Sequence, residues 1–504
     1  MNILLVYPEF PDTFWSFKHA LKFIGRRASS PPLGLITIAA LLPEDWNKRL
    51  IDLNVLTPQQ VDSKLDEGVA WADLVMIGSM AVQRKSAEKV IERAHAAGKK
   101  IVAGGPLFTA EPDEFPLVDF LVLNEAEITL PQFLNDLRQG RPQRVYTTDE
   151  HPDLCSTPVP LWNLVDLKQY DSMSIQFSRG CPFNCDFCNV TALLGHRPRT
   201  KTAEQIITEL DALYNMGWRR NIFFVDDNFI GNKKILKQSI LPALIEWRKG
   251  KTGCRFITEA SINLSDDPEL MDLMVRAGFV SVFVGIETPS EESLEECRKV
   301  QNKNRNLVES VKNMQRHGLQ VMGGFIVGFD SDTPSIFQRQ IDFIQNSGIV
   351  TAMVGLLQAP IGTDLYRRLL NEGRVLDKMS GDNADGLTNI IPKMDLSLLQ
   401  KGYQQILQEI YSPGLFYQRV RNFLQDYNPL EAPVRLEIQE ILAFFRSIYW
   451  LGIRGSERAE YWRLFFWALL KQPRKFALAI TLSIYRFHFW KVFEQHILPN
   501  QSAG

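Results

Sequence analysis

The sequence has little histidine and cysteine, no excess of charge of either sign, and no long apolar run. Seven histidines and six cysteines stand in 504 residues, and 56 basic and 58 acidic side chains give a formal net charge of −2. Because the charges are so nearly balanced, the chain has no overall positive charge to attract nucleic acid, and we expect no nucleic-acid partner. The longest apolar stretch, residues 476–485, is ten residues long, whereas a bilayer span takes about 20.

Three of the six cysteines lie within eight residues, and this crowding is the most informative feature of the chain. They are Cys181, Cys185 and Cys188, in a loop that reads Cys-Pro-Phe-Asn-Cys-Asp-Phe-Cys. Such clustering argues against a disulfide framework and favours metal ligation in a reducing compartment. Three thiolates leave one iron of a cubane cluster without a protein ligand, whereas a structural zinc site takes four ligands. The loop therefore predicts an iron–sulfur site with one open metal position.

Short apolar runs alternate with helical patterns over residues 1–140, which predicts a doubly wound, Rossmann-like parallel sheet. The expected strands are residues 3–7, 49–53, 74–78, 101–104 and 120–123. The expected helices are residues 34–42, 59–68, 85–97 and 130–138. Ligands bind such sheets beyond the carboxyl ends of the strands. The residues at those ends either form a ligand pocket or simply make turns, and they include Ser79, Gly104, Gly105 and Glu125.

A second strand–helix series is expected over residues 171–370, after a proline-containing surface linker at 141–170. Its strands are expected at residues 174–177, 221–225, 255–260, 281–286, 321–327 and 351–357. Its helices are expected at residues 203–216, 267–277, 291–296 and 306–317. Six such units predict a partial (βα)6, TIM-like barrel whose chemistry lies at the carboxyl ends of its strands. The cysteine loop follows the first of these strands, where such a site belongs.

Residues 371–504 predict a helical C-terminal extension that is rich in aromatic side chains, with helices at 437–450, 459–470 and 476–497. The basic run 471–475 beside these helices leaves two interpretations open. The aromatic residues either pack as a cap against the barrel or contact the inner face of a membrane. Residues 1–7 read as a strand, not a signal peptide, so we expect a cytoplasmic protein, with or without peripheral membrane contact.

The three-cysteine loop resembles the signature of the radical S-adenosylmethionine (SAM) enzymes. The doubly wound domain before it is similar to that of their cobalamin-binding subclass, and the C-terminal region resembles the extension of the group that includes hopanoid C-2 methylases. This resemblance implies three cofactors, namely a 4Fe–4S cluster, SAM and cobalamin, and an electron donor such as flavodoxin or ferredoxin. In the family, SAM chelates the open iron and its reductive cleavage gives a 5′-deoxyadenosyl radical.

The resemblance also implies roles for particular residues of the barrel. The three cysteines would ligate the cluster. The positions at which the family contacts SAM are occupied by Phe187, Gly285, Glu287, Gly324 and Gly328. The alternative for Glu287 is a turn residue without a binding role, and the alternative for Gly324 is a glycine that is needed only for packing.

Three further acids are candidates for SAM or substrate contact. Asp226 and Asp227 stand where many radical SAM enzymes have a Gly-Gly-Glu turn that holds the SAM amino group, and a helix cap is their alternative. Glu259 lies on an expected strand, where an inward carboxylate is costly without a partner. Its alternative is a surface salt bridge.

The cobalamin domain has no histidine in the position at which many cobalamin proteins ligate cobalt. Residues 8–14 follow the first strand and contain none, and the His-x-x-Gly at 95–98 reads as a helix end. Cobalamin would therefore bind without a histidine lower ligand. The contacts expected for it are Ser79, Gly104, Gly105 and Glu125.

Together these features predict a cobalamin-dependent radical SAM methyltransferase acting on an unactivated carbon of an apolar substrate, either a hopanoid-type lipid or a tetrapyrrole-like molecule. The aromatic segment 10–27 would line the substrate site or pack between domains. Two alternatives stay open. One is a non-methylating radical SAM enzyme that contracts or cyclises a ring, and the other is an iron–sulfur binding or redox-sensing protein. The sequence points to no catalytic residue beyond the cofactor ligands.

Overall fold

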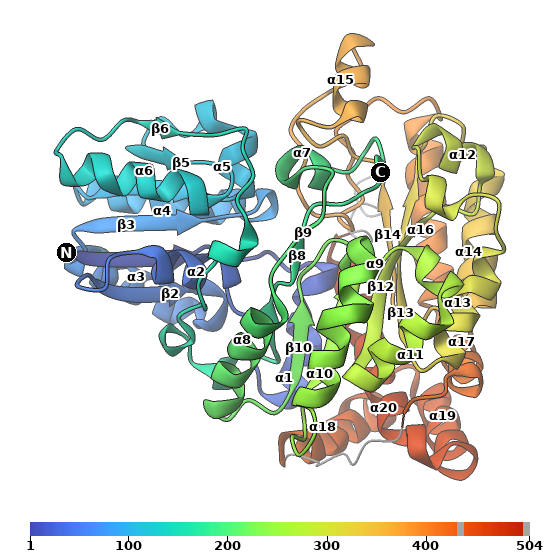
Figure 1. Ribbon diagram of the computed structural model, residues 1–504. Helices are drawn as coiled ribbons and strands as arrows, with labels where there is room; N and C mark the ends of the chain where they lie inside the picture. The colour runs from blue at the N-terminus through green and yellow to red at the C-terminus, as the bar shows by residue number, and fades with distance from the viewer. Residues whose placement is uncertain (431–437, 497–504) are drawn as a thin grey trace. The chain divides into compact units, whose positions relative to one another are not determined.

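The computed structural model describes residues 1–430 and 438–496 of the chain (Figure 1). The chain forms two compact units. The first contains residues 1–11, 27–182 and 189–219, and the second contains residues 12–26, 183–188 and the chain from residue 220 onward. Each unit is built around a parallel sheet, as the alternating pattern predicted.

The sheet of the first unit has the strand order β2-β1-β3-β4-β5-β6, and every pair is parallel. The strands are β1 (Asn2–Tyr7), β2 (Asn47–Asp52), β3 (Leu74–Gly78), β4 (Lys100–Gly104), β5 (Phe120–Val122) and β6 (Val145–Tyr146). The first five confirm the predicted strands, and β6 is an edge strand that the apolar pattern did not indicate. The order reverses between β1 and β3, which is the switch point at which such sheets bind ligands.

Helices cover both faces of this sheet, which confirms the doubly wound architecture. They are α2 (Leu33–Leu41), α3 (Pro58–Trp71), α4 (Arg84–Ala96), α5 (Pro106–Ala110) and α6 (Ala126–Arg138). Alternate residues of a strand point to opposite faces. Leu4 and Val6 of β1 accordingly join the core beneath α3, α4 and α5, whereas Ile3 and Leu5 join the core beneath α2 and α6.

The second sheet contains six strands and confirms the predicted partial barrel. They are β7 (Ser172–Ile175), β10 (Asn221–Phe224), β11 (Arg255–Glu259), β12 (Phe279–Glu287), β13 (Gln320–Val327) and β14 (Ala352–Leu356). From β10 to β14 each strand pairs in parallel with the next one along the chain. This sequential order is that of a barrel wall and brings the carboxyl ends of all five strands to one edge.

One face of the barrel sheet packs against helices through a cluster of phenylalanines. Phe224, Phe256 and Phe279 are fully buried and lie 5.2 to 5.4 Å apart between ring centroids. Trp247 packs on Phe256 from α10 (Leu241–Trp247). The other helices of the series are α11 (Pro268–Ala277), α12 (Glu291–Glu296), α13 (Leu307–Arg316) and α14 (Ser335–Ser347). The opposite face of the sheet is therefore the barrel interior.

The chain after the barrel is helical, as predicted. Its elements are α15 (Asp364–Asn371), α16 (Leu396–Ile410), α17 (Pro413–Asp426), α18 (Ile438–Ser447), the π-helical η12 (Ile448–Ile453), α19 (Arg458–Lys471) and α20 (Phe476–His496). Glu437 and Ile497, which the sequence placed in the first and last of the predicted helices, lie outside the described residues. No helix within residues 1–430 and 438–496 is both long enough and apolar enough to cross a bilayer.

An N-terminal segment folds together with these C-terminal helices. Residues 12–26 contain η1 (Phe14–Ser16) and α1 (Lys18–Ile24) and belong to the second unit. Helix α1 packs on α18 and α20. Arg446 of α18 donates to the backbone oxygen of Phe23 at 2.7 Å. The aromatic N-terminal segment thus has its partners more than 400 residues further along the chain.

Candidate active site

The barrel interior gathers three of the predicted SAM contacts at the ends of neighbouring strands. Glu259 of β11 is in register with Phe283 of β12. Two residues further along β12, Gly285 is in register with Gly324 of β13. Paired residues and residues two apart share a face of a sheet. Glu259, Gly285 and Gly324 therefore lie on the same face, opposite to the helix-covered one.

Both glycines on this face are required by close packing. A Cβ atom on Gly285 would overlap the Glu287 carboxylate and lie 2.8 Å from Nζ of Lys299. A Cβ atom on Gly324 would lie 2.7 Å from the ring of Phe283. The packing interpretation thus holds for Gly324, and its contact with SAM stays a prediction. Gly328 has a φ of 107° and donates its N–H to Asp332 at 2.8 Å, so it shapes the turn after β13.

Glu287 forms a buried ion pair that the sequence did not reveal. Its carboxylate lies 2.6 Å from Nζ of Lys299, and the side chains of Glu287 and Lys299 are only 9% and 12% exposed. Burial disfavours the ammonium ion, but the charge of Glu287 and the nearby Cys185 and Cys188 thiols outweigh it and raise the pKa of Lys299. Glu287 has a φ of 64°, a strained conformation for a residue with a side chain. Nζ of Lys299 also lies 5.9 Å from the centroid of the Phe187 ring.

Backbone and side-chain hydrogen bonds fix the second half of the cysteine loop in the barrel unit. The N–H of Asp186 donates to the backbone oxygen of Cys297 at 3.2 Å, and its own carbonyl accepts from Leu365 at 2.9 Å. Gln301 donates to the sulfur of Cys185 at 3.7 Å. The adjacent Asn302 donates to the backbone oxygen of Gly285 at 3.0 Å. A single turn after α12, containing Lys299, Gln301 and Asn302, therefore contacts both the loop and the strand end.

Asp226, Asp227 and Glu259 form an acidic group at the ends of β10 and β11. Burial raises the pKa of Asp227 to about 6. Burial, with the charges of Asp227 and Asp226, raises the pKa of Glu259 to about 8. Asn228 is the N-cap of the helical turn that follows, so neither aspartate caps it. Asp226 is buried, whereas Asp227 and Glu259 keep some solvent exposure. A bound cation would relieve the repulsion between these three neighbouring acids.

The first unit places three of the predicted cobalamin contacts together beside its switch point. The N–H of Ser79 donates to the backbone oxygen of Gly104 at 3.3 Å. A Cβ atom on Gly105, whose φ is 94°, would lie 3.1 Å from the backbone oxygen of Ser79. A Cβ atom on Gly104 would lie 2.6 Å from the backbone oxygen of Val122. The ends of β3 and β4 thus present bare backbone, which a large flat ligand can approach closely.

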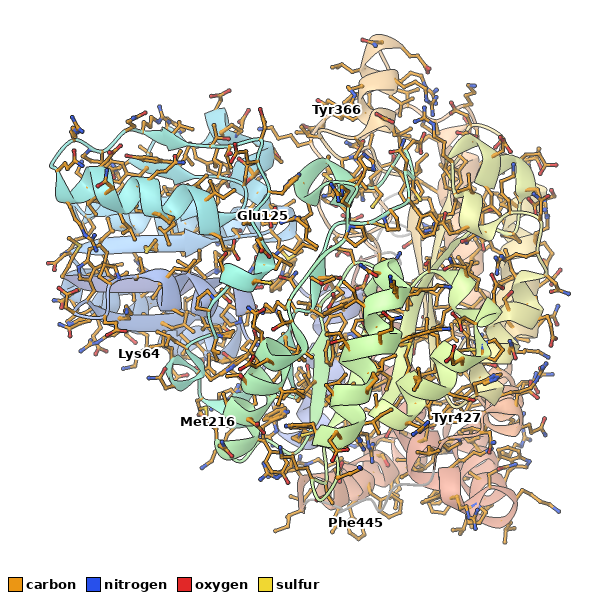
Figure 2. The ribbon with its side chains drawn as sticks, viewed as in Figure 1. Lys64, Glu125, Met216, Tyr366, Tyr427 and Phe445 are labelled. Atoms are coloured by element: carbon orange, nitrogen blue, oxygen red, sulfur yellow. The ribbon has the colours of Figure 1, made fainter. Side chains whose placement is uncertain are left out.

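Glu125, the fourth predicted cobalamin contact and one of the residues labelled in Figure 2, forms ion pairs with cations of its own unit. Its buried carboxylate lies 2.8 Å from Arg179, 2.8 Å from Arg199 and 2.9 Å from His151. Glu127 holds the same Arg179 at 2.9 Å. A contact between Glu125 and cobalamin stays a prediction. Arg179 comes two residues before the first cluster cysteine, so these carboxylates fix the base of the cysteine loop.

The residues present fit the predicted cofactors. One loop supplies three thiols, the donor type that iron–sulfur clusters take. The barrel strand ends carry three acids, which would suit the positively charged groups of SAM, and the first sheet has bare backbone, a platform that would suit a flat ligand. A doubly wound unit with such a platform, followed by a parallel barrel with a three-cysteine loop, defines a radical SAM enzyme with a second, planar cofactor.

Comparison with known proteins agrees with this class. Residues 26–134 match the B12 binding domain, residues 175–344 match the radical SAM superfamily, and residues 363–501 match a domain of unknown function. An uncharacterized methyltransferase of Synechocystis sp. (strain ATCC 27184 / PCC 6803 / Kazusa) is 41% identical over 97% of this chain and 91% of its own length. The hopanoid C-2 methylase of Rhodopseudomonas palustris (strain TIE-1) is 34% identical over 92% of this chain and 88% of its own length.

A solved structure shares the fold. The cobalamin-dependent S-adenosylmethionine radical enzyme OxsB superimposes with a TM-score of 0.62 at 14% sequence identity, covering 99% of this chain and 80% of that one. The chain belongs to the cobalamin-binding radical SAM methyltransferases, and its cofactors are a 4Fe–4S cluster, SAM and cobalamin. Membership sets aside the two alternatives of a non-methylating radical enzyme and of an iron–sulfur sensor.

Proposed function

We propose that this methyltransferase transfers a methyl group to an unactivated carbon of an apolar, hopanoid-type lipid. The observation that carries the proposal is the similarity to hopanoid C-2 methylase, which runs along 92% of the chain. A relative that shared only the cofactor domains would say little about substrate. This similarity extends through the helical region after the barrel, where substrate-specific elements are free to differ between enzymes that share cofactors.

An aromatic wall at the barrel interior supports an apolar substrate. The ring of Trp15 meets Phe283 edge-on at 5.3 Å, and Phe283 shares the inner face of the sheet with Gly285. Nε1 of Trp15 donates to the sulfur of Met353 at 2.9 Å. Phe14 stacks on Phe489 of α20 at 4.1 Å and holds this segment in place. The wall thus offers a substrate aromatic and thioether surface with its one polar N–H already satisfied.

The chain's own residues have separate tasks in this reaction. When bound, the cluster with SAM supplies the radical and cobalamin supplies the methyl group. Asp226, Asp227 and Glu259 bind positive charge at the strand ends, and Phe187 supplies an apolar face within the cysteine loop. Trp15 excludes water from the reacting carbon. We propose flavodoxin or ferredoxin as the one-electron donor, because the cluster must be reduced before SAM is cleaved.

An exposed apolar surface on the C-terminal helices supports delivery of a lipid from a membrane. The exposed apolar residues lie on α18, η12 and α19, and Phe445 of α18 is labelled in Figure 2. The exposed residues of this surface are Ile441, Leu442, Phe445, Tyr449, Trp450, Ile453, Phe466, Leu469 and Leu470. Residues 438–496 carry nine lysines and arginines against four acids, in a chain that is slightly acidic overall. Apolar side chains flanked by basic ones are typical of helices that lie on anionic membranes.

The proposal is tested by giving the enzyme two substrate classes. The reconstituted protein is incubated anaerobically with SAM, a reductant and either a hopanoid or a tetrapyrrole. We expect a hopanoid heavier by one methylene and, per methylation, one S-adenosylhomocysteine and one 5′-deoxyadenosine. Cys185→Ala is expected to abolish the methylated hopanoid and 5′-deoxyadenosine, and Trp15→Ala to raise KM for the hopanoid more than it lowers kcat. Methylation of the tetrapyrrole alone would contradict the proposed substrate while leaving the enzyme class intact.

A further inference from the structure

Three side chains with metal-binding atoms meet far from the cysteine loop in sequence. Asp12 and His19 come from the N-terminal segment, and His488 comes from α20 near the other end of the chain. One ligand atom from each residue lies within 4.8 Å of those of the other two. Among the described residues this is the one group of three or more such side chains that is so closely spaced. None of the three has a role in the methyl transfer described above.

The hydrogen bonds of His488 leave one ring nitrogen available as a ligand. The imidazole is 0% exposed, and its Nε2 lies 2.9 Å from the backbone oxygen of Phe14. A carbonyl only accepts, so Nε2 carries the proton and Nδ1 carries a lone pair. Nδ1 is buried and has no hydrogen-bond partner in the described part of the chain. A buried acceptor left in this way is unfavourable, because it has lost its hydrogen bond to water, and binding a metal ion would remove that cost.

This arrangement is the one that metal-ligating histidines usually show. The ring nitrogen that does not bind the metal donates to a carbonyl or carboxylate, which fixes the tautomer and the ring orientation. For His488 the Phe14 carbonyl has this role, and Phe17 stacks on the ring with centroids 5.3 Å apart. The ring is thus held in one orientation from two sides, as a ligand needs to be.

Asp12 and His19 supply the other two donors. The Oδ2 atom of Asp12 lies 2.8 Å from Nε2 of His19. Ser16 donates its hydroxyl to Oδ1 of Asp12 at 3.1 Å and orients the carboxylate. A simple hydrogen-bonded pair would account for Asp12 and His19 alone. It would not account for His488, which belongs to the same group and whose buried Nδ1 has no hydrogen-bond partner among the described residues.

We propose that Asp12, His19 and His488 bind one divalent transition metal ion. Two imidazoles and one carboxylate are a donor set that suits Zn²⁺ and Fe²⁺, whereas the thiolates of the cysteine loop suit an iron–sulfur cluster. The ion joins the N-terminal segment to α20. It thereby positions Trp15, which belongs to the same short segment and packs on the barrel interior. The site stands independently of the proposed substrate, because it rests only on these three side chains.

Zinc binding to the holoenzyme tests the site. The protein, with its cluster and cobalamin reconstituted, is equilibrated anaerobically with Zn²⁺ and freed of excess by gel filtration, and zinc and iron are counted by mass spectrometry. We expect one zinc ion per chain in the wild type. Asp12→Asn and His19→Gln, whose side chains are only partly buried, are expected to weaken binding at least about tenfold at equal iron content. The matched control is His95→Gln on α4, an exposed histidine.

Zinc K-edge X-ray absorption identifies the donors directly. We expect a nitrogen and oxygen shell at about 2.0–2.1 Å and no sulfur shell at about 2.3 Å. A sulfur shell would place the zinc in the cysteine loop and overturn the proposal. Equal zinc content in the wild type and Asp12→Asn would overturn it as well. An absence of zinc from the wild type would show that the three side chains form only a hydrogen-bonded group.

Discussion

Lys299 places its ammonium group 2.6 Å from the carboxylate of Glu287, in a buried ion pair next to the cysteine loop. The pair joins the end of β12 to the turn after α12, and the same turn contacts Cys185 through Gln301. The cluster loop and the strand end are therefore parts of one hydrogen-bonded assembly. The positive charge beside two cluster thiols also suits a site where thiolates must be stabilised.

Removing one member of this pair is expected to be costly. Lys299→Met leaves the Glu287 carboxylate buried without its partner and should lower the free energy of unfolding by about 3 kcal/mol. The double variant Glu287→Gln with Lys299→Met should recover part of that loss, because no isolated charge stays buried. The control is Arg298→Met, which breaks an exposed ion pair to Asp364 and should cost less than about 1 kcal/mol. Urea denaturation measures all three, and equal losses for Lys299→Met and Arg298→Met would contradict the expectation.

A methyl group on Gly285 should displace the Glu287–Lys299 pair. The added Cβ would overlap the carboxylate and lie 2.8 Å from Nζ of Lys299, so one of the two side chains must move. We expect Gly285→Ala to weaken SAM binding about tenfold or more, measured by equilibrium dialysis on the reconstituted protein. Gly34→Ala on α2 is the matched control, since its Cβ meets nothing within 4 Å. An unchanged dissociation constant for Gly285→Ala would show that the pair does not position SAM.

Glu259 should make the stability of the SAM-free protein depend on pH. Burial and the neighbouring aspartates raise its pKa from 4.5 to about 8. Because its pKa is higher in the folded than in the unfolded state, protonated Glu259 favours the folded state. This contribution to the free energy of unfolding is complete below pH 4.5 and is lost as the pH rises through 8. The free energy of unfolding of the wild type should fall relative to Glu259→Gln, by at most about 1.4 kcal/mol per pH unit.

Chemical denaturation between about pH 5 and 8 measures this difference. Glu92→Gln on α4 is the control, because that side chain is exposed. A pH-independent difference between the wild type and Glu259→Gln would mean that Glu259 is ionised throughout the range.

Loss of the Glu125 carboxylate should destabilise the first unit. Glu125→Gln removes the negative charge shared by Arg179, Arg199 and His151. We expect the free energy of unfolding to fall by about 2–3 kcal/mol, since two partly buried guanidinium groups lose an ionic partner and only Arg179 keeps another, Glu127. The exposed Glu150→Gln nearby should have no measurable effect. If Glu125 also contacts cobalamin, the variant will retain less cobalamin after gel filtration at a temperature where it stays folded.

The apolar surface on α18, η12 and α19 should bind anionic vesicles. Phe445 and Trp450 are 60% and 44% exposed, and replacing both by serine removes apolar area that would enter the lipid interface. We expect at least about tenfold weaker cosedimentation with vesicles that contain phosphatidylglycerol, which corresponds to about 1.4 kcal/mol. Leu117→Ser, at an exposed apolar position of the first unit, is the control. Equal binding of both variants would remove this surface as the site of contact.

The sequence predicted most of the fold because both sheets follow local rules. A buried parallel strand needs a continuous apolar run, and each helix between strands needs one apolar stripe. Both patterns are readable without knowing any partner. The two-residue strand β6 was not predicted, because so short a segment cannot show the alternation of apolar and polar residues that indicates a strand. The helices α16 and α17 lie in a region that was predicted to be helical as a whole, but no bounds were predicted for them, although the buried residues of α16 recur every three or four positions.

The sequence by itself determined the chemistry of the cofactor loop, because three cysteines within eight residues place three thiols on one short segment whatever the rest of the chain does. Only the tertiary structure decided which side chains act on that loop. Lys299 pairs with Glu287, and His488 reaches Asp12 and His19, because packing brings together residues that spacing cannot relate. In the sequence, a charged residue within an amphipathic pattern looks the same whether the folded chain exposes it to solvent or buries it. Burial and a partner at hydrogen-bond distance make the difference, and both arise only when the chain has folded.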